Sequence, residues 1–259
     1  MSLTIILPCA GEGSRLSLGY PKELYAISEE HKLIDFTLEH IIAGVKSGVS
    51  DIDVSVVITK TKENVYEHVS KKLSKFNINV NKVYFNNNYR EWPGSVFSAK
   101  ETFSENNVVL LPDSYMMISE KNQFYNLKGK TIIEMFQSTL EKDKAVFAYI
   151  KTKDIKKLSN LGAMNIEHDK INLFKDKPKK DIHLYNGFWT CYGFKREVAY
   201  KLYEFLLNSV YNISDNLIPP FNFGGFPIFS FADLGTWNSI EEYLLSKSYG
   251  GSNITGKCQ

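Results

Sequence analysis

The sequence predicts an α/β protein with a mostly parallel central sheet. Three observations favour this fold class: short β-branched runs alternate with amphipathic helical patterns, the first run ends in glycine, and no linker rich in proline, glycine or serine divides the chain. The 259 residues, 43% of them hydrophobic, suffice for a domain with a sizeable core. We therefore expect a single domain over residues 1–259, with one half at 1–143 and a second half at 144–259.

The first half alternates regularly between strand and helix patterns. Residues 4–10 form a continuous apolar run that indicates a buried strand, and residues 34–48 place apolar side chains on one helical face before Gly48. The later patterns of this half are strands at 53–59, 80–86 and 107–113 and helices at 62–73 and 95–103. This order predicts a parallel sheet with helices on both faces, a three-layer α/β/α arrangement.

The alternation loosens in the second half. Strand patterns follow one another with few helices between them, at 144–152, 163–168, 170–178 and 187–194. A long amphipathic helix pattern covers 196–211, and a late strand pattern at 226–233 precedes a last helical pattern. The two halves together predict a Rossmann-like fold whose mostly parallel sheet becomes mixed.

Charge and cysteine content restrict the class of partner. Thirty-one Lys and Arg oppose twenty-nine Asp and Glu, so the formal charge is +2 and predicts neither nucleic acid nor a membrane surface as a partner. No segment approaches the roughly 20 apolar residues of a membrane span. The three cysteines lack CxxC spacing, which favours a reducing cytoplasm. The oligomeric state stays open, a homo-oligomer included.

A glycine-rich cationic loop, PCAGEGSRLSLGYPKEL, follows the first strand directly. In an open parallel sheet, ligands bind at the carboxyl ends of strands, where the backbone N–H groups of such a loop can hold phosphates. The dinucleotide fingerprint is excluded because Leu16 stands where the third glycine is needed, and the pattern GxxxxGK[ST] is absent. The remaining pattern is Gly11-x-Gly13-x-Arg15, followed by a Pro-Lys pair at 21–22.

This spacing resembles the amino-terminal signature of the nucleotidyltransferases that activate sugar 1-phosphates, the nucleoside-diphosphate-sugar pyrophosphorylases. The Pro-Lys-Glu at 21–23 is most similar to the glucose-1-phosphate uridylyl- and thymidylyltransferases. The resemblance runs from Ile5 to about Leu245 and implies the nucleotide-diphospho-sugar transferase fold. It further implies an enzyme that condenses an NTP (dTTP, UTP or CTP) with a sugar 1-phosphate and releases pyrophosphate. The first half would bind the nucleotide and the second half the sugar phosphate.

The resemblance also implies which residues face the nucleotide. Arg15 would stabilise the leaving pyrophosphate and Lys22 the α-phosphate, since fixed cations must face that charge. The segment at 91–99 occupies the place of the loop that receives the base, and Gly94-Ser95 is expected to open the next helix. Asparagines stand where the family has its base-reading glutamine, which leaves the base open. The implied nucleotide-binding residues are Ala10, Gly11, Gly13, Ser14, Arg15, Lys22, Asn88, Gly94, Ser95 and Asp113.

Two aspartates end hydrophobic strand patterns 120 residues apart, Asp113 and Asp233. The sequence after Asp233 reads Leu-Gly-Thr and resembles the family's Asp-x-Gly-Thr, while Pro112 replaces the usual glycine before Asp113. The pair would share one Mg²⁺ with the nucleotide phosphates, because this hard ion prefers few carboxylates together with phosphate oxygens and water.

The second half supplies the implied acceptor residues. Asp176-Lys177-Pro178 resembles the family's Glu-Lys-Pro, whose lysine holds the phosphate of the sugar phosphate. Asn186-Gly187 resembles the start of the strand that borders the sugar, and Gly162 stands in a strand expected beside it.

Plainer interpretations remain open at each motif. The loop could be a surface turn with solvated Arg15 and Lys22, the Lys177 segment a charged turn, and Asn186-Gly187 a hairpin turn. Two alternative functions also remain. One is nucleotidyl transfer to a non-sugar phosphate, as in phosphocholine- or polyol-phosphate-type cytidylyltransferases, and the other is a catalytically silent nucleotide-binding regulatory protein of the same fold.

Overall fold

Four parallel strands from the first half form one side of a nine-stranded sheet. The computed structural model describes residues 2–211 and 217–248. The strands lie in the order β3 (Asn79–Tyr84), β2 (Ile52–Ile58), β1 (Leu3–Pro8) and β4 (Asn106–Val109). The expected βαβ alternation is thus confirmed, and every one of these strands ends at the same edge of the sheet.

The other side of the sheet is mixed. It continues from β4 through β9 (Gly187–Lys195), β6 (Ala145–Lys151), β10 (Phe223–Pro227), β8 (Lys170–Asp176) and β7 (Gly162–Glu167). Within this sheet, β9 and β8 run opposite to the other strands, so on this side only β6 and β10, among the described strands, pair in parallel and the sheet as a whole is mixed. An additional pairing between β9 and β7 closes five of these strands into a ring.

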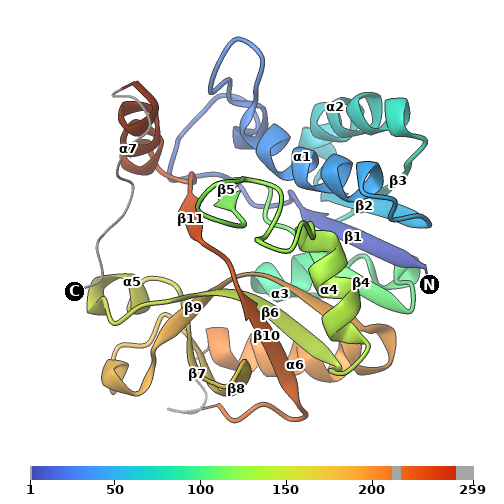
Figure 1. The fold of residues 1–259 in the computed structure, drawn as a ribbon. Coiled ribbons are helices and arrows are strands. Elements are labelled where there is room, and N and C mark those ends of the chain that lie inside the picture. The colour runs from blue at the N-terminus through green and yellow to red at the C-terminus, as the bar shows by residue number, and fades with distance from the viewer. Residues whose placement is uncertain (1, 212–216, 249–259) are drawn as a thin grey trace.

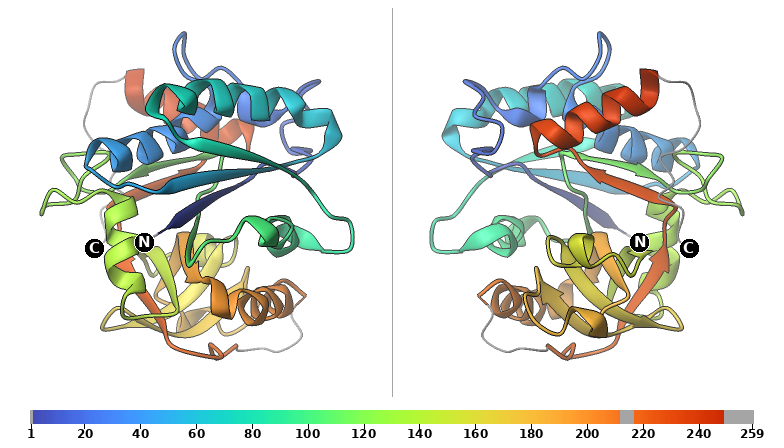
Figure 2. Two further views of the ribbon diagram at one scale, coloured as in Figure 1. Left: turned by 90° about the vertical axis from the view of Figure 1, so that its right-hand side faces the viewer. Right: turned by 90° about the vertical axis from the view of Figure 1, so that its left-hand side faces the viewer.

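Helices cover both faces of the sheet, as the three-layer prediction requires. One core packs the sheet against α1 (Leu33–Lys46), α2 (Glu63–Leu73) and α4 (Ile132–Leu140), and the second packs it against α3 (Glu91–Phe97) and α6 (Ala199–Val210). Figures 1 and 2 show α1 and α2 on the side opposite α6. A short helix, α5 (Ile155–Leu158), precedes β7. No helix in the described part is long and apolar enough to cross a membrane.

Three sequence-based expectations need correction. The helix expected at 95–103 is α3, which begins at Glu91, because proline is tolerated in the first turn, where its missing N–H has no helical partner. Gly94 and Ser95 therefore lie inside α3 and do not open it. The helix α4 was not predicted at all, although Thr131 and Glu134 form a capping box at its start.

The late strand expected at 226–233 is divided between two sheets. Its first part belongs to β10, and its second part is β11 (Ser230–Asp233), which pairs with β5 (Ser114–Met117) in a separate two-stranded ribbon. The switch occurs where the Ile228 N–H donates to Tyr149 O of β6 and the next N–H, from Phe229, donates to Met117 O of β5. The chain therefore exchanges one pairing partner for another, and α7 (Trp237–Ser248) follows β11 (Figure 1).

Candidate functional site

The two-stranded ribbon brings the two predicted metal ligands together. Strands β5 and β11 are antiparallel, and Asp233 at the end of β11 pairs with Ser114 at the start of β5. Asp113 directly precedes Ser114, and its carbonyl accepts a 2.8 Å hydrogen bond from the Leu234 N–H. Antiparallel pairing therefore places the two aspartates side by side, although they are far apart in sequence.

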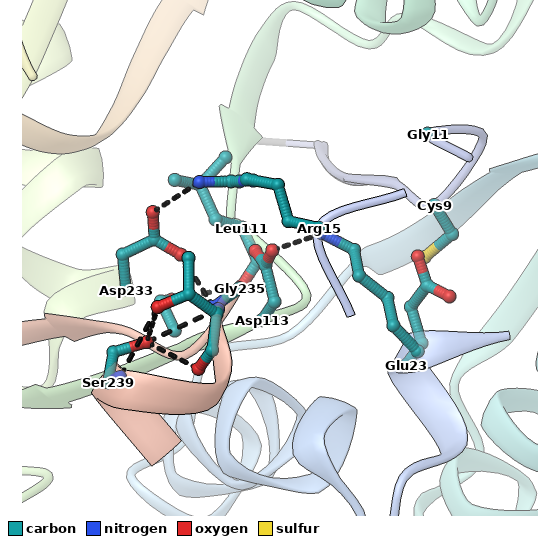
Figure 3. A network of polar contacts seen from close by, with 12 residues as sticks. Cys9, Gly11, Arg15, Glu23, Leu111, Asp113, Asp233, Gly235 and Ser239 are labelled. Carbon is teal, nitrogen blue, oxygen red and sulfur yellow. Dashed lines mark hydrogen bonds and ion pairs between the residues drawn. The ribbon is translucent and has the colours of Figure 1, made fainter. Parts of the chain in front are cut away.

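Gly235 marks the point where the charged side chains converge. A Cβ atom placed on Gly235 would lie 2.8 Å from Asp233 Oδ1, 3.2 Å from Asp113 Oδ2 and 3.0 Å from Arg15 Nη2. Figure 3 shows these side chains gathered around the glycine. The Gly235 N–H also donates a 2.8 Å hydrogen bond to Asp233 Oδ1. Glycine at this position therefore allows the charged atoms to approach the backbone more closely than a Cβ would permit.

Lys22 reaches the same place from the far end of the opening loop. Its ammonium contacts Asp113 Oδ2 directly, and each of the two side chains is 14% exposed. Gly13 adopts a φ of +69°, and a Cβ there would lie 3.3 Å from Lys22 Cγ and Cδ. Glycine at position 13 therefore allows the loop to close over the stem of the lysine.

Arg15 lies at the outer rim of this group. Its Nη1 is 3.7 Å from Asp233 Oδ2, and its side chain is 60% exposed. An exposed pair at this distance contributes little to stability. The guanidinium is therefore available to turn toward an anion that enters the site, to which it can offer several N–H donors.

The electrostatics of the site reflect two carboxylates in one partly buried place. Burial raises the pKa of Asp233, the nearby Asp113 carboxylate raises it further, and the hydrogen bond from Gly235 opposes the rise. Burial alone would lower the pKa of Lys22, but the attraction of Asp113 outweighs burial and raises that pKa. A pair of like charges held beside cations in this way is typical of a functional site.

The donor set fits Mg²⁺. It consists of carboxylate oxygens on two chain segments that converge at Gly235. Among the described residues, no group of three or more His, Cys, Asp or Glu could hold a metal ion. Mg²⁺ commonly binds one or two carboxylates and takes its remaining ligands from phosphate oxygens and water.

The predicted base loop carries fewer free groups than the sequence suggested. Asn88 is exposed, and its N–H bonds Asn86 Oδ1 at 3.0 Å. A Cβ on Gly94 would lie 2.7 Å from the Tyr89 carbonyl carbon, so this glycine permits close packing of the backbone. Ser95 is buried, and its Oγ has no hydrogen-bond partner in the described structure.

Two predicted acceptor residues are occupied by contacts with the sheet. Asn186 Oδ1 accepts a 2.8 Å hydrogen bond from the Ile166 N–H, and its Nδ2 donates at 3.0 Å to Ile166 O, beside a register shift in β7. A Cβ on Gly187 would lie 2.6 Å from Ile166 Cδ1 and 2.8 Å from Ile150 O. Both residues therefore support the meeting of β6, β7 and β9.

Gly162 is covered by an indole ring. A Cβ there would lie 1.8 Å from Trp189 Nε1, and that buried N–H has no hydrogen-bond partner in the described structure. Trp189 packs against Trp92 of α3, with ring centroids 5.1 Å apart. Since Tyr192 of β9 pairs with Val109 of β4, Trp189 lies toward the edge of the sheet at which Asp113 follows β4.

Asp176 and Lys177 lie at the end of β8, beside this pair of tryptophans. Asp176 pairs with Gly162 across β7 and β8. Burial raises the pKa of Asp176, with the Lys177 charge opposing the rise and the Glu91 carboxylate adding to it. The Lys177 side chain is exposed, and its N–H donates to Leu161 O at 3.1 Å. Glu91 from the first half therefore lies near Asp176 from the second.

Sequence reasoning missed three side chains in this region. Trp189 stands within a correctly predicted strand, where an aromatic residue carries no distinct signal. Lys62 and Glu23 form a buried ion pair, with Lys62 Nζ 2.9 Å from Glu23 Oε1. Glu23 belongs to the quoted Pro-Lys-Glu, but its partner follows another strand, and lysine alone is seldom buried.

Comparison with known proteins agrees with this geometry. The family model described as nucleotidyl transferase matches residues 3–245. The chain belongs to the nucleotidyl transferase family. This membership confirms the resemblance inferred from the opening loop and identifies the protein as an enzyme, a nucleotidyltransferase. No curated protein matches the chain by sequence.

Solved structures share the fold of this nucleotidyltransferase at low identity. A UDP-glucose pyrophosphorylase complexed with UDP-glucose is 14% identical, with a TM-score of 0.71 over 96% of this chain and 99% of that one. The UDP-glucose pyrophosphorylase of Acinetobacter baumanii is 16% identical, with a TM-score of 0.68 over 95% and 93%. A Bacillus anthracis protein assigned as a glucose-1-phosphate thymidylyltransferase, in complex with a sucrose, is 17% identical, with a TM-score of 0.65 over 98% of each chain. The predicted fold is therefore confirmed.

Proposed function

We propose that this nucleotidyltransferase condenses a nucleoside triphosphate with a sugar 1-phosphate to give an NDP-sugar and pyrophosphate. The observation that carries the proposal is the convergence of Asp113, Asp233 and Arg15 at Gly235, with Lys22 in contact with Asp113. Two carboxylates and two cations at the carboxyl edge of a parallel sheet suit a triphosphate bound with a divalent cation.

The proposed chemistry is a direct displacement at phosphorus. A phosphate oxygen of the acceptor attacks the α-phosphorus in line, and the bond to the β-phosphate oxygen breaks as the new bond forms. The acceptor attacks as an anion, so neither a protein nucleophile nor a general base is required. Burial raises the pKa of the Cys9 thiol, which keeps this residue neutral in the core.

Three cationic side chains would bind the phosphates of the two substrates. Arg15 would stabilise the leaving pyrophosphate, Lys22 the α-phosphate, and Lys177 the phosphate of the acceptor. The exposure of Arg15 and Lys177 supports these roles, since both side chains can reach a bound anion.

Asp113 and Asp233 would hold Mg²⁺. When bound, this ion would neutralise the charge of the triphosphate and of the departing pyrophosphate. The two carboxylates would fix its position relative to the loop, and the Gly235 N–H keeps Asp233 Oδ1 in place.

The nucleotide would lie along the first half of the edge. The backbone of Ala10, Gly11, Gly13 and Ser14 would face its phosphates. Its base, from dTTP, UTP or CTP, would lie near the residues of the base loop and its helix, which are Asn88, Gly94 and Ser95.

The two tryptophans support a sugar as the acceptor. Trp92 and Trp189 present partly exposed indoles near Asp176 and Gly162, and pockets that bind small molecules commonly combine aromatic walls with a few polar groups. The exposed parts of the two indole rings would pack against the apolar face of the sugar ring. Asp176 and Lys177, with the strand that begins at Asn186-Gly187, would border the ring.

The same features would also suit an acceptor that carries a quaternary ammonium. Indole faces attract such cations, and the carboxylates of Glu91 and Asp176 lie close enough to interact. Transfer to a phosphocholine-like phosphate is therefore the second candidate.

Pyrophosphate release measures both candidates directly. We would incubate the purified enzyme and Mg²⁺ with each of four NTPs and a panel of hexose 1-phosphates, polyol phosphates and phosphocholine. Release with one pyrimidine NTP and a sugar 1-phosphate is the expected result. Release only with phosphocholine or a polyol phosphate would establish the alternative acceptor, and no release with any pair would refute both.

A cytoplasmic setting is part of the proposal, because Cys9 and Cys191 are free thiols; a homo-oligomer stays open.

A further inference from the structure

A lysine ammonium is buried directly beneath the glycine loop. Lys62 precedes α2, is 6% exposed, and belongs to neither the phosphate-facing nor the acceptor-facing group described above. Its Nζ donates to Gly11 O at 2.6 Å, to Cys9 O at 2.9 Å and to both carboxylate oxygens of Glu23 at 2.9 Å. Figure 3 shows the Glu23 carboxylate directed toward Cys9 and Gly11.

These contacts tie together the two ends of the loop. Cys9 and Gly11 belong to its first residues, and Glu23 belongs to the 3₁₀ turn Lys22–Leu24 that carries the Lys22 side chain to Asp113. A buried ammonium without partners would be strongly unfavourable, but here one carboxylate and two carbonyls accept all three of its donors. The arrangement therefore fixes the start of the loop relative to Lys22.

The carbonyl contacts also set the direction of the loop's N–H groups. No peptide bond in the described residues is cis, and in a trans peptide the C=O and the following N–H point in opposite directions. Because the carbonyls of Cys9 and Gly11 point inward to Lys62, the N–H groups of Ala10 and Glu12 point away from it. A Cβ on Gly11 would meet nothing within 4 Å, so the space beside this residue is open.

We propose that Lys62, with Glu23 as its counterion, is a positioning residue that orients the phosphate-binding loop. It turns the first peptide units of the loop so that their N–H groups face outward, and it holds Lys22 at a fixed distance from them. This inference rests on the proposed function in that the bound group is taken to be a polyphosphate. Preorganised N–H groups bind an anion without the entropy loss of ordering the loop at each encounter.

The test separates the position of the loop from the stability of the fold. The double variant Lys62→Met with Glu23→Leu removes both buried charges, and such apolar replacements often keep or increase stability. We expect a melting temperature close to that of the wild type, but a Kd for inorganic pyrophosphate with Mg²⁺, measured by calorimetry, that is at least about tenfold higher. The exposed neighbour Lys60→Met is the matched control and should leave both values unchanged. Wild-type affinity in a folded double variant would overturn the proposal.

A single substitution covers the case in which the double variant does not fold. Glu23→Gln keeps the ammonium and both carbonyl contacts, so it should lower the melting temperature but change the pyrophosphate Kd by less than about threefold. A loss of affinity of tenfold or more in Glu23→Gln would show that the carboxylate, and not Lys62, holds the loop.

Amide hydrogen exchange distinguishes failure of this inference from failure of the proposed function. Without any ligand, residues 10–16 should exchange faster in the double variant than in the wild type, because the loop has lost its anchor. Unchanged exchange would refute the role of Lys62 even if the enzyme is active. Conversely, faster exchange together with no pyrophosphate release from any NTP pair would support the positioning role and refute the proposed reaction.

Discussion

The edge near Gly235 and the edge near Gly162 differ in what their predicted residues do. At Gly235, the side chains of Asp113, Asp233 and Arg15 direct charged atoms to one point. At Gly162, the predicted small and amide residues are engaged within the sheet, and an indole ring covers the glycine. Like charges held together beside cations are typical of functional sites, whereas Asn and Gly often serve backbone packing. The first kind of motif therefore indicates a site more reliably than the second.

The largest effect should come from the carboxylates at Gly235. Asp233→Asn or Asp113→Asn keeps the shape of the side chain but removes the charge that would hold Mg²⁺, so kcat should fall by about 10³-fold or more. Steady-state assays of pyrophosphate release, with folding checked by circular dichroism, measure this. EDTA should abolish wild-type activity and added Mg²⁺ restore it. Full activity of a folded Asp233→Asn enzyme would show that the carboxylates at Gly235 are not needed for the reaction, and the contrast with Gly162 would no longer hold.

Arg15→Ala should have the next largest effect. We expect kcat to fall by about 10²–10³-fold because a cation that faces the leaving group is lost. The melting temperature should change little, since the side chain is 60% exposed and its ion pair is long. Paired turnover and thermal-melting measurements test this, with Arg15→Lys expected to retain part of the activity. An unchanged kcat would show that Arg15 is a solvent-exposed residue with no role in turnover.

Asn186→Ala should lower stability but leave turnover nearly unchanged, the opposite of what we expect for Arg15→Ala. The variant leaves the buried N–H and carbonyl of Ile166 without partners, so the free energy of unfolding should fall by about 1–3 kcal/mol. Turnover per folded molecule should stay within about threefold of the wild type. Chemical denaturation and activity assays below the transition decide the point. Lost turnover at unchanged stability would make Asn186 an acceptor-binding residue.

Trp189→Phe asks whether the acceptor edge binds ligand at all. The smaller phenyl ring removes the part of the indole that covers Gly162 and shortens the aromatic wall, so the KM for the acceptor should rise by about 3–10-fold with little change for the NTP. Varying each substrate in turn separates the two constants. Equal KM values in both enzymes would leave Trp189 a purely structural residue.

The smallest effects concern the pH dependence of stability in the two halves. Burial would raise the pKa of Asp35 on α1, but hydrogen bonds from His68, the Lys32 backbone and Lys72 outweigh burial and lower it to about 2. The lowered pKa of Asp35 adds to the free energy of unfolding. This stabilisation is complete above pH 3.8, the ordinary pKa, and is lost as the pH falls toward 2. The raised pKa of Asp176 has the opposite effect on stability. Its stabilisation of the folded state is complete below pH 3.8 and is lost as the pH rises through the raised pKa.

Urea unfolding at a series of pH values compares these two carboxyl groups. The stability difference between the wild type and Asp35→Asn should shrink below pH 3.8, and Asp176→Asn should gain on the wild type as the pH rises above that value. Parallel pH profiles for the wild type and both variants would show that neither carboxyl group is perturbed by its half of the fold.

Several features of this protein follow from its sequence alone. The alternation of apolar runs with amphipathic patterns predicts β1 to β4 and the helices α1 and α2, because periodicity records which face of each segment is buried. The opening loop predicts a phosphate site because Gly11, Gly13 and Arg15 follow a buried strand. These inferences depend on neighbours along the chain, so no knowledge of distant contacts is needed.

Other features were decided only by the tertiary structure. The ribbon of β5 and β11 aligns Asp233 with Asp113, Trp189 covers Gly162, and Lys62 pairs with Glu23. Each depends on which distant segments meet, and the strand switch after β10 shows that one continuous apolar run can serve two sheets. Local patterns record the burial and turning of a segment but not its partner, and the choice of partner is made by packing of the whole chain.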